Sequence, residues 1–251
     1  MEKEIILELK GINKSFDGIQ AVNNFDLILH KKEIVALVGD NGAGKSTLIK
    51  IISGVHRKDT GKIFIEGKEA HIENPLDAKK YGIETVYQDE GVIKIFDASS
   101  NLFLGREKYM GNFLGRWFKF LDKNYMIIET KKLLQKIGVE LKDINIELNS
   151  LSGGQRQSVV VGRAVYWGGK VLIFDEPTNN LGVKQEKKVI DLIKRIRDDF
   201  DVSIIIISHN INHVFELVDR IVVLRNGFKV GEKIKNETNT NEIVSMITGV
   251  L

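Results

Sequence analysis

The chain has 251 residues, of which 43% are hydrophobic and 28% are charged. This composition is typical of a globular α/β protein with enough apolar mass for a real core. The net charge of +3 is too small to indicate a basic stripe for nucleic acid. The absence of cysteine excludes a disulfide framework and thiolate metal sites. No stretch approaches the roughly 18 apolar residues of a membrane helix, so any membrane role is expected to depend on a partner.

The predicted elements begin with an antiparallel strand layer, formed by residues 4–30 together with 61–66. After this layer, short β-branched runs alternate with helical patterns, which indicates a parallel sheet with crossover helices. Several runs are apolar without alternation, as expected for strands covered on both faces. The predicted strands are 33–38, 82–87, 171–174, 202–207 and 220–224, and the predicted helices are 45–52, 123–137, 184–199, 211–218 and 242–247.

Residues 89–149 differ from their surroundings, because they lack clear strand patterns and look mostly helical. We interpret them as a helical subdomain inserted into the α/β core. The expected organisation is a single domain over residues 1–251, with 1–88 and 150–251 forming the core and its β layer. The fold class is therefore α/β, with a mostly parallel sheet, an N-terminal antiparallel layer and an inserted helical subdomain.

A phosphate-binding loop is predicted at residues 39–46, which satisfy the pattern G-x-x-x-x-G-K-[ST]. Its glycines let backbone N–H groups turn inward around phosphate oxygens, and the following helix adds its N-terminal dipole. Lys45 is expected to reach the β- and γ-phosphates, and Ser46 to ligate Mg²⁺. The alternative is a glycine-rich turn with an incidental lysine, but the motif follows an apolar strand and opens a helix. The predicted nucleotide-binding residues are Gly39, Asn41, Gly42, Gly44, Lys45, Ser46 and Thr47.

Two acidic residues, Asp175 and Glu176, follow the apolar strand that ends at Phe174. They are expected at the carboxyl end of the sheet, where α/β proteins place their ligands. Asp175 fits a Mg²⁺ ligand, and Glu176 fits the group that polarises the attacking water. A solvated turn would give the same local pattern, but the phosphate loop upstream favours the functional interpretation.

The run Leu151-Ser152-Gly153-Gly154-Gln155 begins a further helix, and Ser152 fits its N-cap. At these residues the sequence resembles the ABC ATPase family, of which LSGGQ is the signature. The resemblance implies that Ser152, Gly153, Gly154 and Gln155 contact the γ-phosphate of ATP held by a second subunit. It extends over nearly the whole chain, from Ile6 to about Gly231.

The same resemblance assigns three further residues. Gln88 looks like the glutamine that senses Mg²⁺ and the attacking water, so it joins Ser46 and Asp175 in the implied metal set. His209 looks like the switch histidine on the γ-phosphate, which makes Glu176, His209 and Gln88 the implied catalytic residues. Phe16 looks like the aromatic residue that stacks on adenine, where the family more often has tyrosine.

Two short stretches are similar to the ATPases of monosaccharide (ribose- or xylose-type) uptake systems, namely residues 86–90 and 100–107. Residues 182–185 and 208–215 support the same resemblance. The family usually has an acid where Gly182 stands, but glycine is a familiar variant among the sugar-uptake ATPases. This chain is similar to their single-domain branch.

The resemblance implies an ATPase that binds ATP and Mg²⁺ and forms an ATP-dependent dimer with a second copy of itself. It implies a transmembrane permease as partner, a sugar-binding protein as indirect partner, no nucleic acid, and a peripheral location on the cytoplasmic face of the cell membrane. Two alternatives remain open: an importer subunit for a substrate other than a sugar, and a soluble ABC ATPase that acts on nucleic acid or ribosomes.

An aromatic cluster with basic residues between its members occupies residues 113–121 of the predicted helical subdomain. Its members are Phe113, Leu114, Trp117, Phe118, Phe120 and Leu121, interspersed with Arg116 and Lys119. Three interpretations fit this pattern: local core of the helical subdomain, a docking surface for a cytoplasmic helix of the permease, or contact with the membrane interface.

Overall fold

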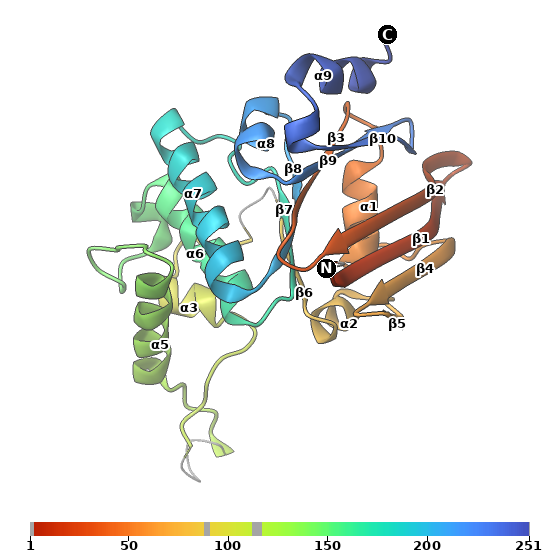
Figure 1. Cartoon of the computed structure of the whole chain (residues 1–251). Helices are drawn as coiled ribbons and strands as arrows, with labels where there is room; N and C mark the ends of the chain where they lie inside the picture. Colours follow the sequence, from red (N-terminus) through yellow and green to blue (C-terminus); the bar gives the residue numbers. More distant parts are fainter. Residues whose placement is uncertain (1–2, 88–90, 112–116, 251) are drawn as a thin grey trace. The chain divides into compact units, whose positions relative to one another are not determined.

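The computed structural model describes residues 3–87, 91–111 and 117–250. The chain divides into two compact units, each described by itself below and labelled in Figure 1. The first unit comprises Met1–Gln88, Gly168–Pro177 and Ile196–Leu251, and the second comprises Asp89–Trp167 and Thr178–Arg195.

The first unit contains the predicted antiparallel layer as a four-stranded sheet. Its strands are β1 (Ile5–Phe16), β2 (Ile19–His30), β4 (Thr60–Ile65) and β5 (Lys68–Glu69), in the order β2-β1-β4-β5. Asp17 and Gly18 join β1 to β2 with φ values of 48° and 82°. A two-residue hairpin of this kind needs positive φ at both positions, which Asp and Gly tolerate.

The first unit also contains a six-stranded sheet in the order β10-β9-β3-β8-β7-β6. Its strands are β3 (Ile34–Val38), β6 (Ile83–Val86), β7 (Val171–Asp175), β8 (Ser203–Ile207), β9 (Arg220–Arg225) and β10 (Phe228–Ile234). The pairs β3–β8, β3–β9, β6–β7 and β7–β8 are parallel. The predicted fold class, a mostly parallel sheet with an antiparallel N-terminal layer, is confirmed.

Strand β10 was not predicted from the sequence. It pairs antiparallel with β9 at one edge of the sheet. The turn between them is Asn226-Gly227, with φ values of 50° and 82°. Asn-Gly is a strong hairpin signal, so the information for β10 was present in the sequence.

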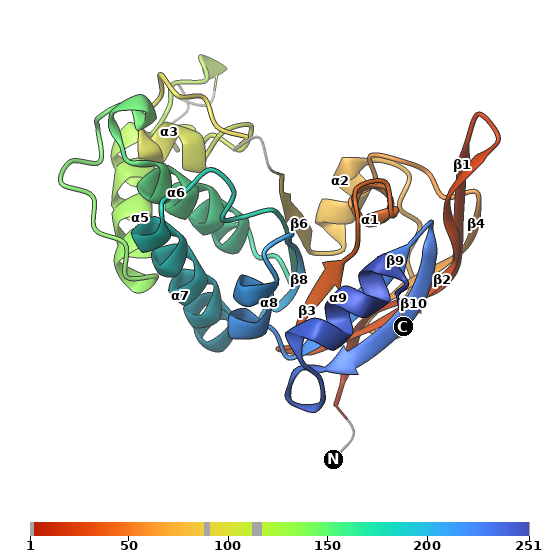
Figure 2. The same ribbon diagram turned by 90° about the horizontal axis from the view of Figure 1, so that it is seen from above.

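Helices of the first unit connect and cover these strands. They are α1 (Lys45–Ile52), α2 (Pro75–Lys80), α8 (Ile211–Leu217) and α9 (Thr240–Thr248). Figure 2 shows α9 lying along the β9–β10 hairpin. Met246 of α9 fills the space next to Gly231 of β10, where a Cβ atom would lie 1.9 Å from the Met246 Cε atom. The helix is therefore packed tightly on the sheet edge.

The second unit consists of helices. They are α3 (Ala98–Leu102), α5 (Lys123–Lys136), the 3₁₀ turn Leu148–Ser150, α6 (Gly153–Tyr166), and residues 183–195 of α7 (Val183–Phe200). Buried Phe103 makes edge-to-face contacts with Tyr125, Tyr166 and Trp167, at centroid distances of 5.2 to 6.3 Å. Three helices of this unit thus share one aromatic core.

The second unit is larger than the predicted helical subdomain of residues 89–149. It also includes residues 150–167 and 178–195, which the sequence analysis placed in the core. Helix α6 belongs to it because α6 packs against α3 and α5. That the two units together form one ATPase domain stays a prediction.

Candidate functional site

The phosphate loop begins where β3 ends and closes where α1 begins. Gly39 has a φ of 152°, and a Cβ atom there would lie 2.2 Å from the carbonyl oxygen of Leu224. Gly44 has a φ of 103°, and its Cβ would lie 2.4 Å from the carbonyl oxygen of Ala21. Both positions therefore require glycine, because the neighbouring backbone leaves no room for a side chain.

Lys45 points back into this loop. Its Nζ donates to the carbonyl oxygens of Gly39 at 2.6 Å and of Asp40 at 2.9 Å. The side chain is buried, and burial lowers the pKa of Lys45 while the charges of Glu176, Asp40 and Asp175 oppose that shift. A buried ammonium that donates to neutral carbonyl oxygens can bind an anion such as a phosphate group.

Asp175 and Glu176 lie at the carboxyl end of β7, as the sequence predicts. Burial raises the pKa of both carboxyl groups. For Asp175 the positive charges of Lys45, Lys50 and His209 oppose the shift. Two partly desolvated carboxylates close to a lysine form a site suited to a cation with its anionic ligand.

Glu176 is held in an unusual conformation next to His209. Its φ is 54°, a left-handed value that is uncommon for a residue with a side chain. The backbone N–H of Glu176 donates to Ile207 at 3.0 Å, which fixes the turn to the end of β8. Its Oε2 accepts a hydrogen bond from the backbone N–H of His209 at 3.3 Å, and its Oε1 lies 3.2 Å from the His209 Nε2.

A cavity of about 180 Å³ connects the phosphate loop to the histidine. It is lined by Gly39, Asp40 and Asn41 of the loop, by Ser208, His209 and Ile211, and by Val38 and Ile247. Ile247 comes from α9, close to the end of the chain. Sequence reasoning missed this residue, because no local pattern reveals which distant helix closes a cavity.

Phe16 lies at the end of β1 and is 39% exposed. Its ring meets His56 edge to face at a centroid distance of 5.1 Å, and the Lys14 Nζ lies 5.2 Å from its centroid. Stacking of Phe16 on adenine stays a prediction, for which this ring has the needed exposure.

The implied Mg²⁺ ligands are Ser46, Asp175 and Gln88. Ser46 is exposed in the first turn of α1, directly after Lys45. Asp175 offers a partly desolvated carboxylate, a donor that Mg²⁺ prefers. Gln88 lies outside the described residues. The hydroxyl and carboxylate that the structure describes fit a hard cation bound beside phosphate oxygens.

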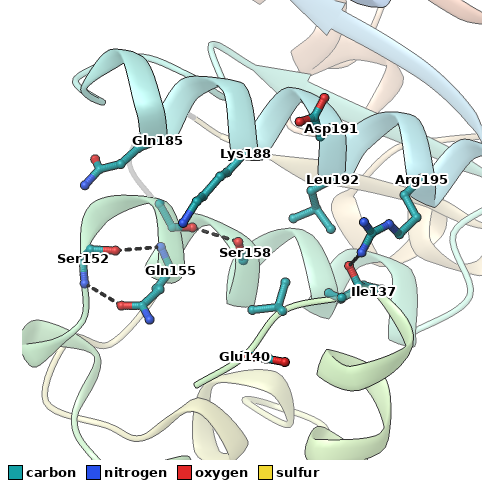
Figure 3. Close-up of a pocket in the computed structure, with 13 residues that line it drawn as sticks. Ile137, Glu140, Ser152, Gln155, Ser158, Gln185, Lys188, Asp191, Leu192 and Arg195 are labelled. Carbon is teal, nitrogen blue, oxygen red and sulfur yellow. Dashed lines mark hydrogen bonds between the residues drawn. The ribbon is translucent and has the colours of Figure 1, made fainter. Parts of the chain in front are cut away.

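The signature residues open α6 in the second unit. The Ser152 Oγ accepts from the Gln155 N–H at 3.3 Å, and the Gln155 Oε1 accepts from the Ser152 N–H at 3.1 Å, as Figure 3 shows. This capping box fixes the first turn of the helix. The N-cap interpretation of Ser152 is thus correct, and Gln155 uses its side chain for the cap.

The two signature glycines pack against the start of α7. A Cβ on Gly153 would lie 2.9 Å from the Leu181 Cδ2, and one on Gly154 would lie 3.3 Å from the Gln185 Cβ. Both glycines therefore have a packing role within their own unit, besides the phosphate contact that the family resemblance implies.

A groove of about 630 Å³ runs beside this helix start (Figure 3). Ser152, Gln155 and Ser158 line it from α6, and Gln185, Lys188 and Arg195 line it from α7. Arg195 donates to the carbonyl oxygen of Ile137 at 2.9 Å, which satisfies the C-terminal end of α5. The α7 residues were missed in the sequence analysis, since they carry no motif.

Comparison with known proteins identifies the class. The family model described as ABC transporter matches residues 22–179, which is more than half of the chain. The chain belongs to the ABC transporter family and is one of its ATP-binding subunits, which are ATPases.

The relatives and solved structures give a more detailed likeness. The xylose/arabinose import ATP-binding protein of Sulfolobus acidocaldarius is 43% identical over 97% of this chain and 94% of its own length. The fructose import ATP-binding protein of Rhizobium meliloti is 40% identical over 99% of this chain and 96% of its own length. A solved nucleotide-free ATP-binding cassette from an ABC transporter matches with a TM-score of 0.82 and 25% identity, over 96% of this chain and 98% of that one. The resemblance to sugar-uptake ATPases is therefore confirmed.

Proposed function

We propose that this chain hydrolyses ATP to drive the uptake of a monosaccharide through a membrane permease. The observation that carries the proposal is the grouping of Lys45, Glu176 and His209 at the carboxyl end of the parallel sheet. The sugar class is supported by relatives that are named as import ATP-binding proteins for xylose/arabinose and for fructose and that match almost end to end.

The chemistry that we propose is in-line attack of water on the γ-phosphate of ATP, which breaks the bond to the β–γ bridging oxygen and releases ADP and phosphate. Lys45 leaves its loop carbonyls and neutralises charge on the β- and γ-phosphates. Glu176 accepts the proton of the attacking water, and His209 donates to the γ-phosphate. A Mg²⁺ ion held by Ser46, Asp175 and Gln88 would supply further charge neutralisation at the phosphates.

We propose further that the site is completed by a second copy of the chain. In this arrangement the partner's signature loop covers the γ-phosphate, so ATP favours the closed dimer over the open one. Closure and reopening would then act on the permease, while a separate binding protein selects the sugar. Within the described ranges, no helix is both long enough and apolar enough to cross a bilayer. The likeness to import ATP-binding proteins supports placing the chain as a peripheral subunit on the cytoplasmic face of the membrane.

The test is the rate of ATP hydrolysis per chain, measured against protein concentration. We expect the rate to rise with concentration until dimers saturate, and to fall by at least about 100-fold in Glu176→Gln, because general base catalysis contributes that much. Glu176→Gln should still bind ATP and should form a stable dimer in size-exclusion chromatography with ATP. A monomer that hydrolyses at the full rate would contradict the shared site.

The transport assignment needs a separate measurement. With a permease and a sugar-binding protein in proteoliposomes, we expect hydrolysis to be stimulated by one monosaccharide and not by its unrelated analogues. Stimulation by another class of solute would keep the importer and change the substrate. Hydrolysis stimulated by RNA or ribosomes, and lost at raised salt, would favour the alternative of an ABC ATPase that acts on nucleic acid.

A further inference from the structure

An exposed aromatic patch lies in the second unit between α3 and α5. Trp117 is 73% exposed, Phe118 61% and Phe120 56%. We define the 109–121 patch as Tyr109, Met110, Trp117, Phe118, Phe120 and Leu121, all of them large apolar side chains with substantial exposure. So many in one short segment are unusual for a surface that faces only water.

Backbone contacts pair the two ends of this patch in antiparallel fashion. Tyr109 and Leu121 form an antiparallel bridge. The Met110 N–H donates to Phe120 at 2.9 Å, and the Asp122 N–H donates to Lys108 at 2.7 Å. Figure 1 shows this yellow-green segment extending away from α3 and α5. Tyr109, Met110, Phe120 and Leu121 are thus exposed on two segments that are paired through their backbones.

The interpretation of these residues as local core is wrong for the members that the structure describes. The aromatic core of this unit is formed by Phe103, Tyr125, Tyr166 and Trp167. Phe118 and Phe120 instead stack on each other, at a centroid distance of 5.9 Å, while both remain exposed. Phe113 and Leu114 of the predicted cluster lie outside the described residues.

The net positive charge of the chain is concentrated in the sequence segment that contains this patch. Residues 106–123 contain five basic side chains (Arg106, Lys108, Arg116, Lys119 and Lys123) and two acidic ones (Glu107 and Asp122), a net charge of +3. The net charge of the whole chain is also +3, so the other residues balance to zero. An aromatic surface with this excess of positive charge is complementary to a negatively charged one.

The two acids are engaged in local backbone contacts. The Glu107 Oε1 accepts from the Gly105 N–H at 2.8 Å, and the Asp122 Oδ1 accepts from the Tyr125 N–H at 3.0 Å as the N-cap of α5. Lys108, Lys119 and Lys123 are exposed. Among the described residues of this segment, four basic side chains outnumber two acidic ones, so the charge offered to a partner is mainly positive.

We propose that the 109–121 patch binds the interface of an anionic lipid bilayer directly. Trp, Tyr and Phe rings favour the headgroup region, and lysines beside them attract anionic headgroups. Docking of a permease helix normally uses a concave groove. The groove beside α6 and α7 is lined by other residues, and so is a second groove of about 390 Å³ that is formed by residues between Lys131 and Ile144. The patch is instead displayed on a projecting segment. The inference does not depend on the ATP site or on a permease.

The chain offers a built-in reporter, because it has two tryptophans. Trp117 belongs to the patch, whereas Trp167 belongs to the aromatic core and donates its Nε1–H to Leu102 at 2.8 Å. In Trp167→Phe the tryptophan emission comes from Trp117 alone, and in Trp117→Phe it comes from Trp167 alone. With vesicles of equimolar phosphatidylcholine and phosphatidylglycerol, we expect a blue shift of the Trp117 emission and none of the Trp167 emission. Vesicles of phosphatidylcholine alone should give a weaker shift.

Vesicle flotation of the full chain provides a second readout, which does not require Trp167→Phe to fold. Phe118→Ser with Phe120→Ser should abolish flotation and leave ATP hydrolysis in the absence of vesicles unchanged. Lys119→Gln and Lys123→Gln should each weaken binding by about fivefold, and raised salt should weaken it further. Ile95→Ser, which changes an exposed apolar residue outside the patch, should leave flotation unchanged.

Two results would overturn the proposal. One is the absence of a Trp117 shift and of flotation with both kinds of vesicle. The other is loss of copurification with the permease in detergent, without a bilayer, when Phe118 and Phe120 are replaced while vesicle binding persists unchanged. That second result would identify the patch as a protein-docking surface. Neither measurement uses ATP turnover, so the outcome is separate from that of the proposed function.

Discussion

The Nε2 atom of His209 lies 3.2 Å from the Oε1 atom of Glu176. This oxygen is buried and accepts no hydrogen bond of good geometry from the described residues. The Glu176 side chain is 9% exposed, whereas that of His209 is 55% exposed. The pair therefore joins a desolvated carboxylate to a ring that solvent or a bound phosphate can reach, and the first prediction concerns this ring.

His209→Ala should lower turnover by about 100-fold with little change in the KM for ATP, because the ring acts on the γ-phosphate during transfer. The backbone N–H of His209, which also contacts Glu176, is kept in this variant. His71→Ala is the matched control, since the His71 side chain is exposed and its hydrogen bond to Tyr81 comes from the backbone. Steady-state hydrolysis checks both variants, and equal losses in the two would refute a specific role of His209.

The second prediction concerns stability against pH without nucleotide. Burial raises the pKa of Glu176. There is consequently a pH range in which the folded chain still carries the proton of this carboxyl group and the unfolded chain has released it. The free energy of unfolding therefore falls as the pH rises from the ordinary value of 4.5 through the raised pKa. Glu176→Gln should be more stable than the wild type above this window, and the difference should vanish below it.

Glu242 provides a control of opposite sign. Hydrogen bonds from Lys233 and Thr238 lower the pKa of Glu242. The stability it contributes is present above 4.5 and is lost as the pH falls through its lowered pKa. Glu242→Gln should thus be less stable than the wild type at neutral pH. Urea unfolding at a series of pH values measures both variants, and a shift of the same sign in the two would contradict the linkage.

The third prediction separates two roles of Ser152, as the N-cap of α6 and as a contact to the nucleotide. Ser152→Ala removes the N-cap and should cost about 1 kcal/mol of stability. The control is Asn74→Ala, which removes the N-cap of α2. The Asn74 side chain accepts hydrogen bonds from the backbone N–H groups of Leu76 and Asp77, so its loss should cost a similar amount of stability. Only Ser152→Ala is expected to lower the rate of ATP hydrolysis at saturating protein concentration. If both variants hydrolyse ATP at the wild-type rate, Ser152 serves only as the N-cap of α6.

The fourth prediction concerns a buried ion pair of the first unit. Arg220 donates from Nε and from a terminal nitrogen to the two carboxylate oxygens of Glu33, each at 2.8 Å, and both residues are buried. Arg220 also contacts Glu232. Arg220→Met leaves the Glu33 carboxylate buried without this partner and should cost about 3–5 kcal/mol.

Adding Glu33→Gln to Arg220→Met tests the cause of that cost. The amide keeps an acceptor for the His30 N–H, which donates to Glu33 at 2.9 Å, and removes the buried charge. We expect the double variant to be more stable than Arg220→Met in urea unfolding. If the loss of stability in the double variant equals the sum of the losses in Arg220→Met and Glu33→Gln, the two residues do not interact.

Much of the fold was predictable because its signals are local. Strands β3 and β7 were predicted as residues 33–38 and 171–174 from short apolar runs rich in β-branched residues, and α1 was predicted with its observed bounds. Strand β10 was missed, although the dipeptide Asn226-Gly227 is typical of the turn in a β-hairpin. The sequence analysis placed α6 in the core, whereas its contacts are with α3 and α5 of the second unit. The apolar face of a helix indicates that it is covered but not by which helices.

The sequence by itself determined the family and the chemical groups, because the phosphate loop, the acidic pair and the signature are short motifs with fixed spacing. Only the tertiary structure decided which side chains meet. It placed His209 against Glu176, brought Ile247 to the phosphate loop and left the 109–121 patch exposed. The physical reason is that spacing fixes how side chains point along one element, whereas burial and contact depend on elements far apart in the chain.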